Sequence, residues 1–213
     1  MIRAEKLPVD IFAHGLWAGV GAGLVSIPRP TTYVARPPRG MSKVAKQHLL
    51  MSRRWKLSGR TIALTAAMAV LPDLVQWVPM VAWAFFSPGG FETVRAYVQA
   101  LPGSEPVLPP TVALLTYHLH CVMHSAIVAG AVTLLVWGAL RWFWIPLLGW
   151  WSHIVIDVFT HSADFYPSPV LYPITQRGFD GVAWNTPWFM VVNYLALTLA
   201  CTWLAWSCRS RPT

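Results

Sequence analysis

The sequence predicts an all-α protein, a polytopic bundle of about five helices that cross a membrane. The chain of 213 residues is 55% hydrophobic and only 11% charged, and its mean hydropathy is +0.48. An ordinary soluble domain carries about 25% charged residues, so a soluble fold of this length is not expected. We therefore interpret residues 1–213 as a single membrane domain of apolar helices joined by loops.

Five apolar segments are long enough to cross the hydrocarbon core, or nearly so: Val9–Ile27, Thr61–Phe86, Thr111–Leu140, Phe143–Thr160 and Pro187–Ser207. The first is the weakest because it is short and contains Asp10 and His14. If it is re-entrant, or a signal peptide that is removed, four spans remain. No small-x-small cleavage site precedes Pro28, which favours five spans.

The net charge of +8 is concentrated in one loop, so it does not indicate a nucleic-acid-binding surface. Nine of the sixteen Lys and Arg residues lie between Arg29 and Arg60, directly before an apolar segment. With the N-terminus outside, only four basic residues fall on the outer side: Arg3, Lys6, Arg95 and Arg177. The positive-inside rule therefore predicts an outer N-terminus and a cytoplasmic C-terminus, with membrane lipids as neighbours and no nucleic-acid partner.

Three stretches between the apolar segments are predicted to lie outside the bilayer core. Residues 28–60 read as a basic cytoplasmic loop, flexible or lying on anionic lipid. On the outer side, residues 87–110 contain a short amphipathic piece at Phe91–Leu101, and residues 162–186 are rich in Pro, Tyr and Trp. We expect these two outer loops to lie at the membrane interface.

Ionisable side chains inside the apolar segments are the candidate functional residues, because an unpaired charge within a bilayer is costly. Six of the seven histidines lie in or at the edge of these segments, the exception being His48. His120 and His124 are four residues apart, so they would share one helix face and suit two ligands of one metal ion. His118 would point away from that pair. For a single membrane histidine, the alternative is a hydrogen bond between helices.

The fourth segment carries His153, Asp157 and His161 at intervals of four residues. They would form one polar stripe on an otherwise apolar helix, and with no basic partner such a stripe is difficult to explain by packing alone. Imidazole and carboxylate ligands suit zinc, and also manganese or iron. Asp157 could also bridge two ions, or orient a histidine ligand without touching the metal.

Asp73 and His14 complete the polar set. Asp73 follows Pro72 in the middle of the second segment, where an unpaired carboxylate would take up a proton, so a metal or histidine partner is the more economical reading. His14 lies beside Gly15, where it could instead make an interhelical hydrogen bond. With the predicted orientation, the histidines lie in the outer halves of their segments, so the set could meet in a cavity open to the outer face.

In their order along the chain, these motifs resemble the YdjM-like family of membrane-bound metal-dependent hydrolases of the bacterial inner membrane. The matching stretches are Ala13-His14-Gly15, Leu71-Pro72-Asp73, Met123-His124-Ser125, Ser152-His153 with Asp157 and Thr160, and Tyr172-Pro173. The resemblance implies a metal-ligand set of His14, Asp73, His124, His153 and Asp157. The chain departs from the family where Leu74-Val75 replaces a second acid, where His118-Leu119-His120 replaces His-Arg-Gly, and where His161 stands in place of proline.

The motifs and the resemblance together predict a metal-dependent hydrolase that acts on a lipid or phosphoester substrate at the outer membrane face. One or two divalent ions, most simply zinc, would be the cofactor. His120, His161 or Asp164 would be a further ligand or the general acid or base. The alternatives are a metal or proton transporter, which should have a polar path to both faces, and a scaffold in which histidines only join helices.

Overall fold

The computed structural model describes residues 10–26, 57–100 and 103–209. Within these ranges it contains helices and no β-strand, which confirms the predicted all-α class. The helices are α1 (Asp10–Ser26), α3 (Gly59–Phe85), α4 (Gly90–Gln99), α5 (Pro110–Met123), α6 (Ala126–Leu140), α7 (Leu147–Thr160) and α8 (Pro187–Arg209). Residues 28–56 of the predicted cytoplasmic loop lie outside the described residues.

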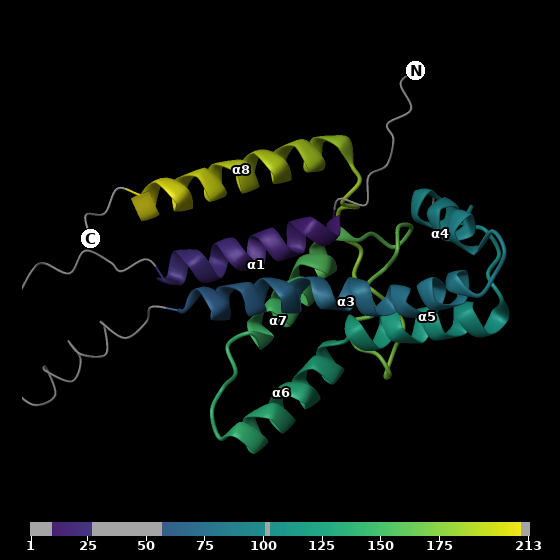
Figure 1. Ribbon diagram of the computed structural model, residues 1–213, viewed down its shortest axis with the longest axis horizontal. Coiled ribbons are helices and arrows are strands. Elements are labelled where there is room, and N and C mark those ends of the chain that lie inside the picture. The colour runs from purple at the N-terminus through teal and green to yellow at the C-terminus, as the bar shows by residue number, and fades with distance from the viewer. Residues whose placement is uncertain (1–9, 27–56, 101–102, 210–213) are drawn as a thin grey trace, which may run out of the picture.

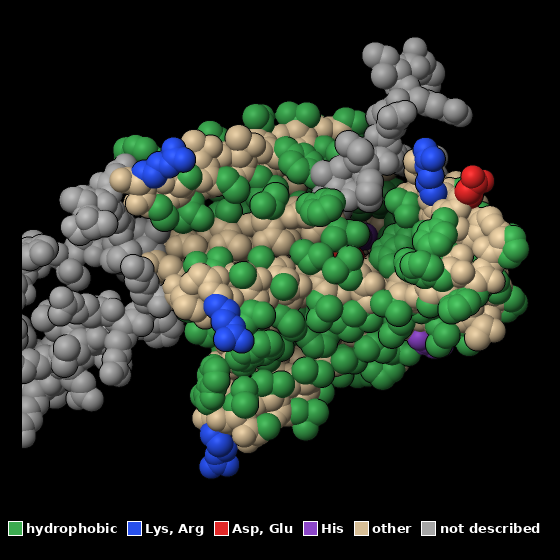
Figure 2. Space-filling model, viewed as in Figure 1, with side chains coloured by type: hydrophobic (Ala, Val, Ile, Leu, Met, Phe, Trp, Pro, Cys, Tyr) green, Lys and Arg blue, Asp and Glu red, His purple; other side chains and the backbone are tan. Residues whose placement is uncertain are grey.

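Two helices, α3 and α8, are each long and apolar enough to cross a bilayer. Helices α5 and α6 reach that length only as a pair, and α1 and α7 are shorter apolar helices. Figure 2 shows the surface expected of such a protein, since hydrophobic side chains cover most of the visible face and charged ones lie near the ends. The amphipathic piece predicted within residues 87–110 is the separate helix α4.

Helix α3 is the centre of the bundle and contacts α1, α4, α5 and α7. In Figure 1, α1 lies between α3 and α8, α5 runs beside the second half of α3, and α6 points away from the bundle. This arrangement brings the beginning of α1, the middle of α3 and the ends of α5 and α7 to one region.

Glycine allows α3 and α7 to approach closely. A Cβ atom at Gly149 of α7 would overlap the backbone carbonyl oxygen of Thr65 in α3. Where α1 meets α3, a Cβ atom at Gly15 of α1 would lie 2.7 Å from Val70 Cγ2. Any larger side chain at these positions would push the helices apart, and the side chains that face each other across them would separate.

The third predicted apolar segment is not one continuous helix. It breaks between Met123 and Ala126, and the axes of α5 and α6 differ by 64°. Ser125 begins α6, because its hydroxyl accepts a hydrogen bond from Val128 N. Trp150 Nε1 donates to Met123 O at 2.6 Å and Ala126 N donates to Val170 O at 2.8 Å, so neighbouring segments satisfy backbone groups freed at the break.

Candidate metal centre

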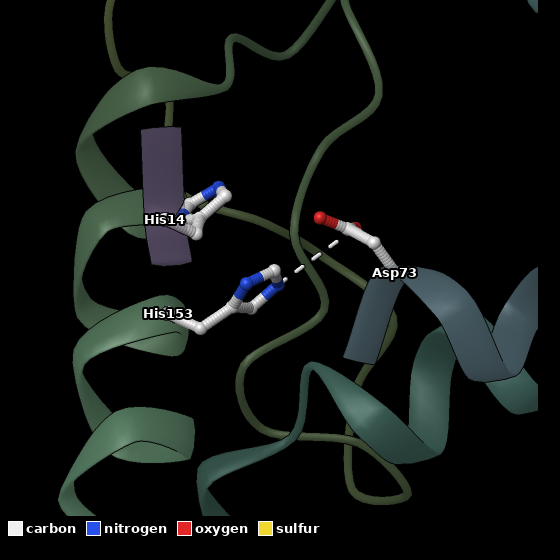
Figure 3. A group of neighbouring side chains, drawn as sticks. All are labelled: His14, Asp73 and His153. Atoms are coloured by element: carbon white, nitrogen blue, oxygen red, sulfur yellow. Dashed lines mark ion pairs between the residues drawn. The ribbon is translucent and has the colours of Figure 1, made fainter. Parts of the chain in front are cut away.

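Five ionisable side chains meet inside the bundle: His14 from α1, Asp73 from α3, His124 from the end of α5, and His153 and Asp157 from α7. Four of them are at most 1% exposed, and the side chain of Asp73 is 13% exposed. Figure 3 shows the side chains of His14, Asp73 and His153 directed toward one another from three different helices. The structure therefore brings together the whole set that the family resemblance implies as metal ligands.

The Asp157 carboxylate lies at the middle of this cluster. Its Oδ1 is 3.0 Å from His14 Nε2, while its Oδ2 is 3.1 Å from both His124 Nε2 and His153 Nε2. Asp73 stands further off, with its Oδ1 3.5 Å from His124 Nε2 and 3.8 Å from His153 Nε2. Two carboxylates and three imidazoles thus surround one small volume that is largely shielded from solvent.

The tautomers of His124 and His153 follow from their backbone partners. His124 Nδ1 lies 2.8 Å from the carbonyl oxygen of His120, and His153 Nδ1 lies 2.8 Å from that of Ala69. A carbonyl only accepts, so both Nδ1 atoms carry the proton and both neutral rings present an Nε2 lone pair. These two Nε2 atoms are 3.0 Å apart. Two lone pairs and a carboxylate oxygen at such distances repel unless a cation lies among them.

The helical turn before Pro72 supplies a backbone acceptor to the cluster. The carbonyl oxygen of Ala69 in that turn accepts the hydrogen bond from His153 Nδ1. Proline lacks an N–H, so Pro72 withdraws one helical donor from the same turn, although α3 continues as a helix through it. The Ala69 carbonyl fixes the ring of the histidine opposite.

The donor set and its dimensions fit a divalent metal ion. With metal–ligand bonds of about 2.0–2.1 Å, tetrahedral ligands lie about 3.3 Å from one another. The candidate groups are His14, Asp73 and His153, and His124, His153 and Asp157, with ligand atoms within 4.8 Å of one another. His153 belongs to both groups but offers only Nε2, because its Nδ1 is held by Ala69. The two groups therefore describe overlapping halves of one centre, which favours one ion over two.

Helix ends add to the negative potential of the centre. Helix α5 ends at Met123 with His124 as its C-cap, and α7 ends at Thr160 with His161 as its C-cap. The carbonyl end of a helix carries a partial negative charge, so two such ends favour a cation in their vicinity. Helix α1 begins in the same region, and its N-terminal end carries a partial positive charge. The two carbonyl ends and the two carboxylates outweigh it, so the electrostatic potential at the centre is negative.

Gln76 is a member of the site that the sequence analysis missed. Its Nε2 donates to Asp73 Oδ1 at 3.2 Å, and its Oε1 lies 2.8 Å from His120 Nδ1. Since the amide nitrogen faces Asp73, the amide oxygen must accept from His120, which leaves His120 Nε2 unprotonated. The signal was available, because Gln76 is an uncharged polar residue one helical turn after Asp73 in an apolar segment.

His120 and His161 stand beside the cluster. His120 is not part of either candidate ligand group, so its pairing with His124 on one ion stays a prediction. Its Nδ1 is held by Gln76, and its ring centroid lies 4.2 Å from that of His124. His161 Nδ1 lies 3.1 Å from the Asp157 carbonyl oxygen and 3.8 Å from Asp157 Oδ1. Its Nδ1 therefore carries the proton, and its Nε2 is a potential base.

Asp164 and His118 lie away from the cluster. Helix α7 ends at Thr160 and the backbone is extended at His161, so the helical spacing does not continue to Asp164. Asp164 is exposed and does not line the cavity beside the centre, so its predicted catalytic role has no support in the geometry. His118 is also exposed, with Nδ1 3.2 Å from the Tyr172 hydroxyl, and it points away from the centre as the helical spacing predicts.

A cavity of about 470 Å³ adjoins the cluster. Asp73, Gln76, His120, His124 and His161 form part of its wall, and the rest is mainly apolar and aromatic. Its volume falls within the range of about 300–1,000 Å³ found for small-molecule sites. A candidate metal centre at the wall of such a cavity is accessible to a small molecule.

Tyr166 is an exposed part of the cavity wall and joins two outer loops. Its hydroxyl donates to Glu105 Oε1 at 2.7 Å, across 61 residues of sequence. Burial, and then the bond to Glu105, raises the pKa of Tyr166 well above its ordinary value. Partial burial acts to raise the pKa of Glu105, but hydrogen bonds from Tyr166 and from backbone amides outweigh it and leave this pKa below its ordinary value.

Comparisons of the chain with protein-family models, with curated proteins and with solved structures find no match.

Proposed function

We propose that this protein is a metal-dependent hydrolase of the bacterial cytoplasmic membrane, with its active site near the outer face. The observation that carries the proposal is the pair of inward Nε2 lone pairs on His124 and His153, which meet the Asp157 carboxylate beside a cavity of substrate size. Zinc suits this nitrogen and oxygen donor set best, and manganese and iron are the alternatives. The substrate is a lipid or another ester that reaches the site from the membrane surface.

A divalent ion held by His124, His153 and Asp157 would supply Lewis acidity and would bring the pKa of a bound water close to neutral. The protein holds the ligands in place, because the Nδ1 hydrogen bonds of His124 and His153 fix both rings. His120 and His161 lie on the cavity wall with unprotonated Nε2 atoms. Either one can accept a proton from the attacking water and return it to the leaving group.

The transporter alternative is less well supported. A conducting pathway should continue from the cluster to the other face of the membrane. The sequence contains no His, Asp, Glu, Lys or Arg from residue 126 to residue 140, or from residue 190 to residue 206. The polar cluster therefore has no continuation along α6 or along most of α8.

The test is hydrolysis by the purified full-length protein of a panel of lipid esters and phosphoesters, with and without added zinc or manganese. We expect metal-dependent turnover in the wild type and its loss in Asp157→Ala and His153→Ala. The matched control is His118→Ala, which removes an exposed histidine outside the cluster and should keep full turnover. Metal flux into vesicles without turnover would instead support a transporter.

A further inference from the structure

The apolar lining of the cavity beside the candidate metal centre narrows the class of substrate, and this inference rests on the proposed hydrolase function. Away from the polar wall it is lined by apolar and aromatic side chains: Trp77, Met80, Val98, Leu108, Phe165 and Trp184. They come from α3, α4 and the two outer loops. A wall of this kind gains free energy from covering hydrocarbon and offers little to a hydrated head group.

The cavity is poorly suited to an anionic substrate. Among the described residues that line it there is no Lys or Arg, while Asp73 is part of the wall. The carbonyl ends of α5 and α7 lie at the same place, as described above. Sites that bind phosphate groups usually supply Arg, Lys or several backbone amides. Here a phosphate would have the metal ion as its main positive partner and a carboxylate as its neighbour.

One buried hydroxyl in the wall has no protein partner. Thr116 of α5 is 8% exposed and lines the cavity, and its Oγ1 makes no hydrogen bond within the described residues. The hydroxyls of Thr65, Thr133 and Thr160 each donate to the carbonyl four residues earlier, as helical threonines commonly do. Leaving a buried hydroxyl unsatisfied costs about 1–3 kcal/mol, so Thr116 would gain a hydrogen bond by rotating its side chain toward a polar group bound in the cavity.

We infer that the substrate is an uncharged carboxylic ester with one long hydrocarbon chain. The chain lies along Trp77, Met80 and Val98, and an oxygen of the ester or its alcohol accepts a hydrogen bond from Thr116. In the reaction, water adds to the ester carbonyl carbon, the bond from that carbon to the alcohol oxygen breaks, and the alcohol leaves with a proton. The products are a carboxylic acid and an alcohol, and no oxidant or further reactant is needed.

The experiment measures binding, so it does not depend on turnover. The probes are hexadecylglycerol, an uncharged ether that cannot be hydrolysed as an ester, and hexadecyl phosphate, which has the same chain and an anionic head. Equilibrium binding of each to the full-length zinc-loaded protein is measured in the same detergent. We expect hexadecylglycerol to bind at least about tenfold more tightly, because the described cavity wall has no Lys or Arg to pair with the phosphate and places the Asp73 carboxylate beside it.

Two pairs of variants locate the binding. Ala113→Trp places a bulky ring in the cavity wall and should reduce hexadecylglycerol binding more than tenfold, whereas Leu114→Trp, at the next position of α5 and not part of the cavity wall, should not. Thr116→Val keeps the shape and removes the hydroxyl, and should weaken binding about three- to tenfold, the value of one hydrogen bond. Thr116→Ser should retain binding. The second pair remains informative if Ala113→Trp does not fold.

Tighter binding of hexadecyl phosphate, or equal binding by Ala113→Trp and Leu114→Trp, would overturn the inference. Turnover of phosphoesters without turnover of uncharged esters would also overturn it and leave the hydrolase proposal intact. Chain binding at the cavity with no hydrolysis of any ester would instead contradict the proposed function.

Discussion

His124 and His153 face each other with their Nε2 atoms 3.0 Å apart, although each ring keeps its proton on the opposite nitrogen. In their neutral forms the two histidines have no proton to share, and the Asp157 oxygen 3.1 Å away adds a third electron pair. Positive charge among these three atoms, from a metal ion or from a proton on one Nε2, would offset their repulsion. A metal ion satisfies all three at once, whereas a single proton can join only one pair.

Asp157→Asn should abolish metal binding. Asparagine keeps the size of the side chain but removes the charge that faces three imidazoles. Loss of a residue that only orients a ligand typically lowers metal affinity about 10–100-fold, so loss of this central carboxylate should lower it by at least about 100-fold. Metal content after gentle purification is the measurement. Asp164→Asn is the matched control, because that carboxylate is exposed, and unchanged metal content in both variants would contradict the assignment.

Gln76→Met should weaken the metal site without removing a ligand. Methionine fills a similar volume but cannot donate to Asp73 or accept from His120. We expect metal affinity to fall about tenfold, the lower part of the range for residues that orient ligands. Competition with a chelator of known affinity measures this, and Gln76→Glu, which can still accept from His120, separates the two contacts. Wild-type affinity in Gln76→Met would show that the bridge does not support the site.

Gly149→Ala should destabilise the bundle, because its Cβ atom would overlap the Thr65 carbonyl at the contact of α3 with α7. Overpacking of this kind costs about 1–3 kcal/mol. Gly138→Ala in α6 is the control, since a Cβ atom there meets nothing within 4 Å. Both changes gain the same helix propensity of about 1 kcal/mol, so the difference between their thermal midpoints in detergent isolates the clash. Equal midpoints would contradict the close approach.

The bond between Tyr166 and Glu105 should depend on pH. The pKa of Glu105 is lowered in the folded protein, so the bond stabilises the fold above the unfolded value of about 4.3. This stabilisation is lost as the pH falls through the lower folded pKa. Hydrogen exchange of residues 162–168 should therefore be slower in the wild type than in Glu105→Gln at neutral pH. The two should converge under strongly acidic conditions, and a constant difference at every pH would refute the assignment.

The positions of the long helices can be predicted from the local sequence, but the break between α5 and α6 cannot. Apolar length and composition are sufficient to place α3 and α8. The break at His124 and Ser125 involves neither Pro nor Gly in the chain at that point. Its freed backbone groups bond to Trp150 Nε1, which donates to Met123 O, and to Val170 O, which accepts from Ala126 N; both partners are distant in sequence, so a local pattern does not predict the break.

The polar cluster was predictable in its members and less so in their roles. Ionisable residues in apolar segments are conspicuous, and His153 and Asp157 do share one face of α7. The helical spacing also predicts His120 and His124 as ligands of one ion, but it does not predict that Gln76 holds His120 Nδ1. Spacing along a helix gives the face on which a residue lies, whereas its role depends on what the neighbouring helix presents there.

The most direct test of the metal centre is the metal content of the gently purified full-length protein, followed by X-ray absorption at the edge of the bound metal. We expect about one equivalent of metal with at least two imidazole nitrogens and a carboxylate oxygen at about 2.0–2.2 Å. His124→Ala and His153→Ala should each remove one imidazole from that spectrum or abolish binding. Less than about a tenth of an equivalent of bound metal, with added zinc failing to restore it, would contradict a metal centre at this site.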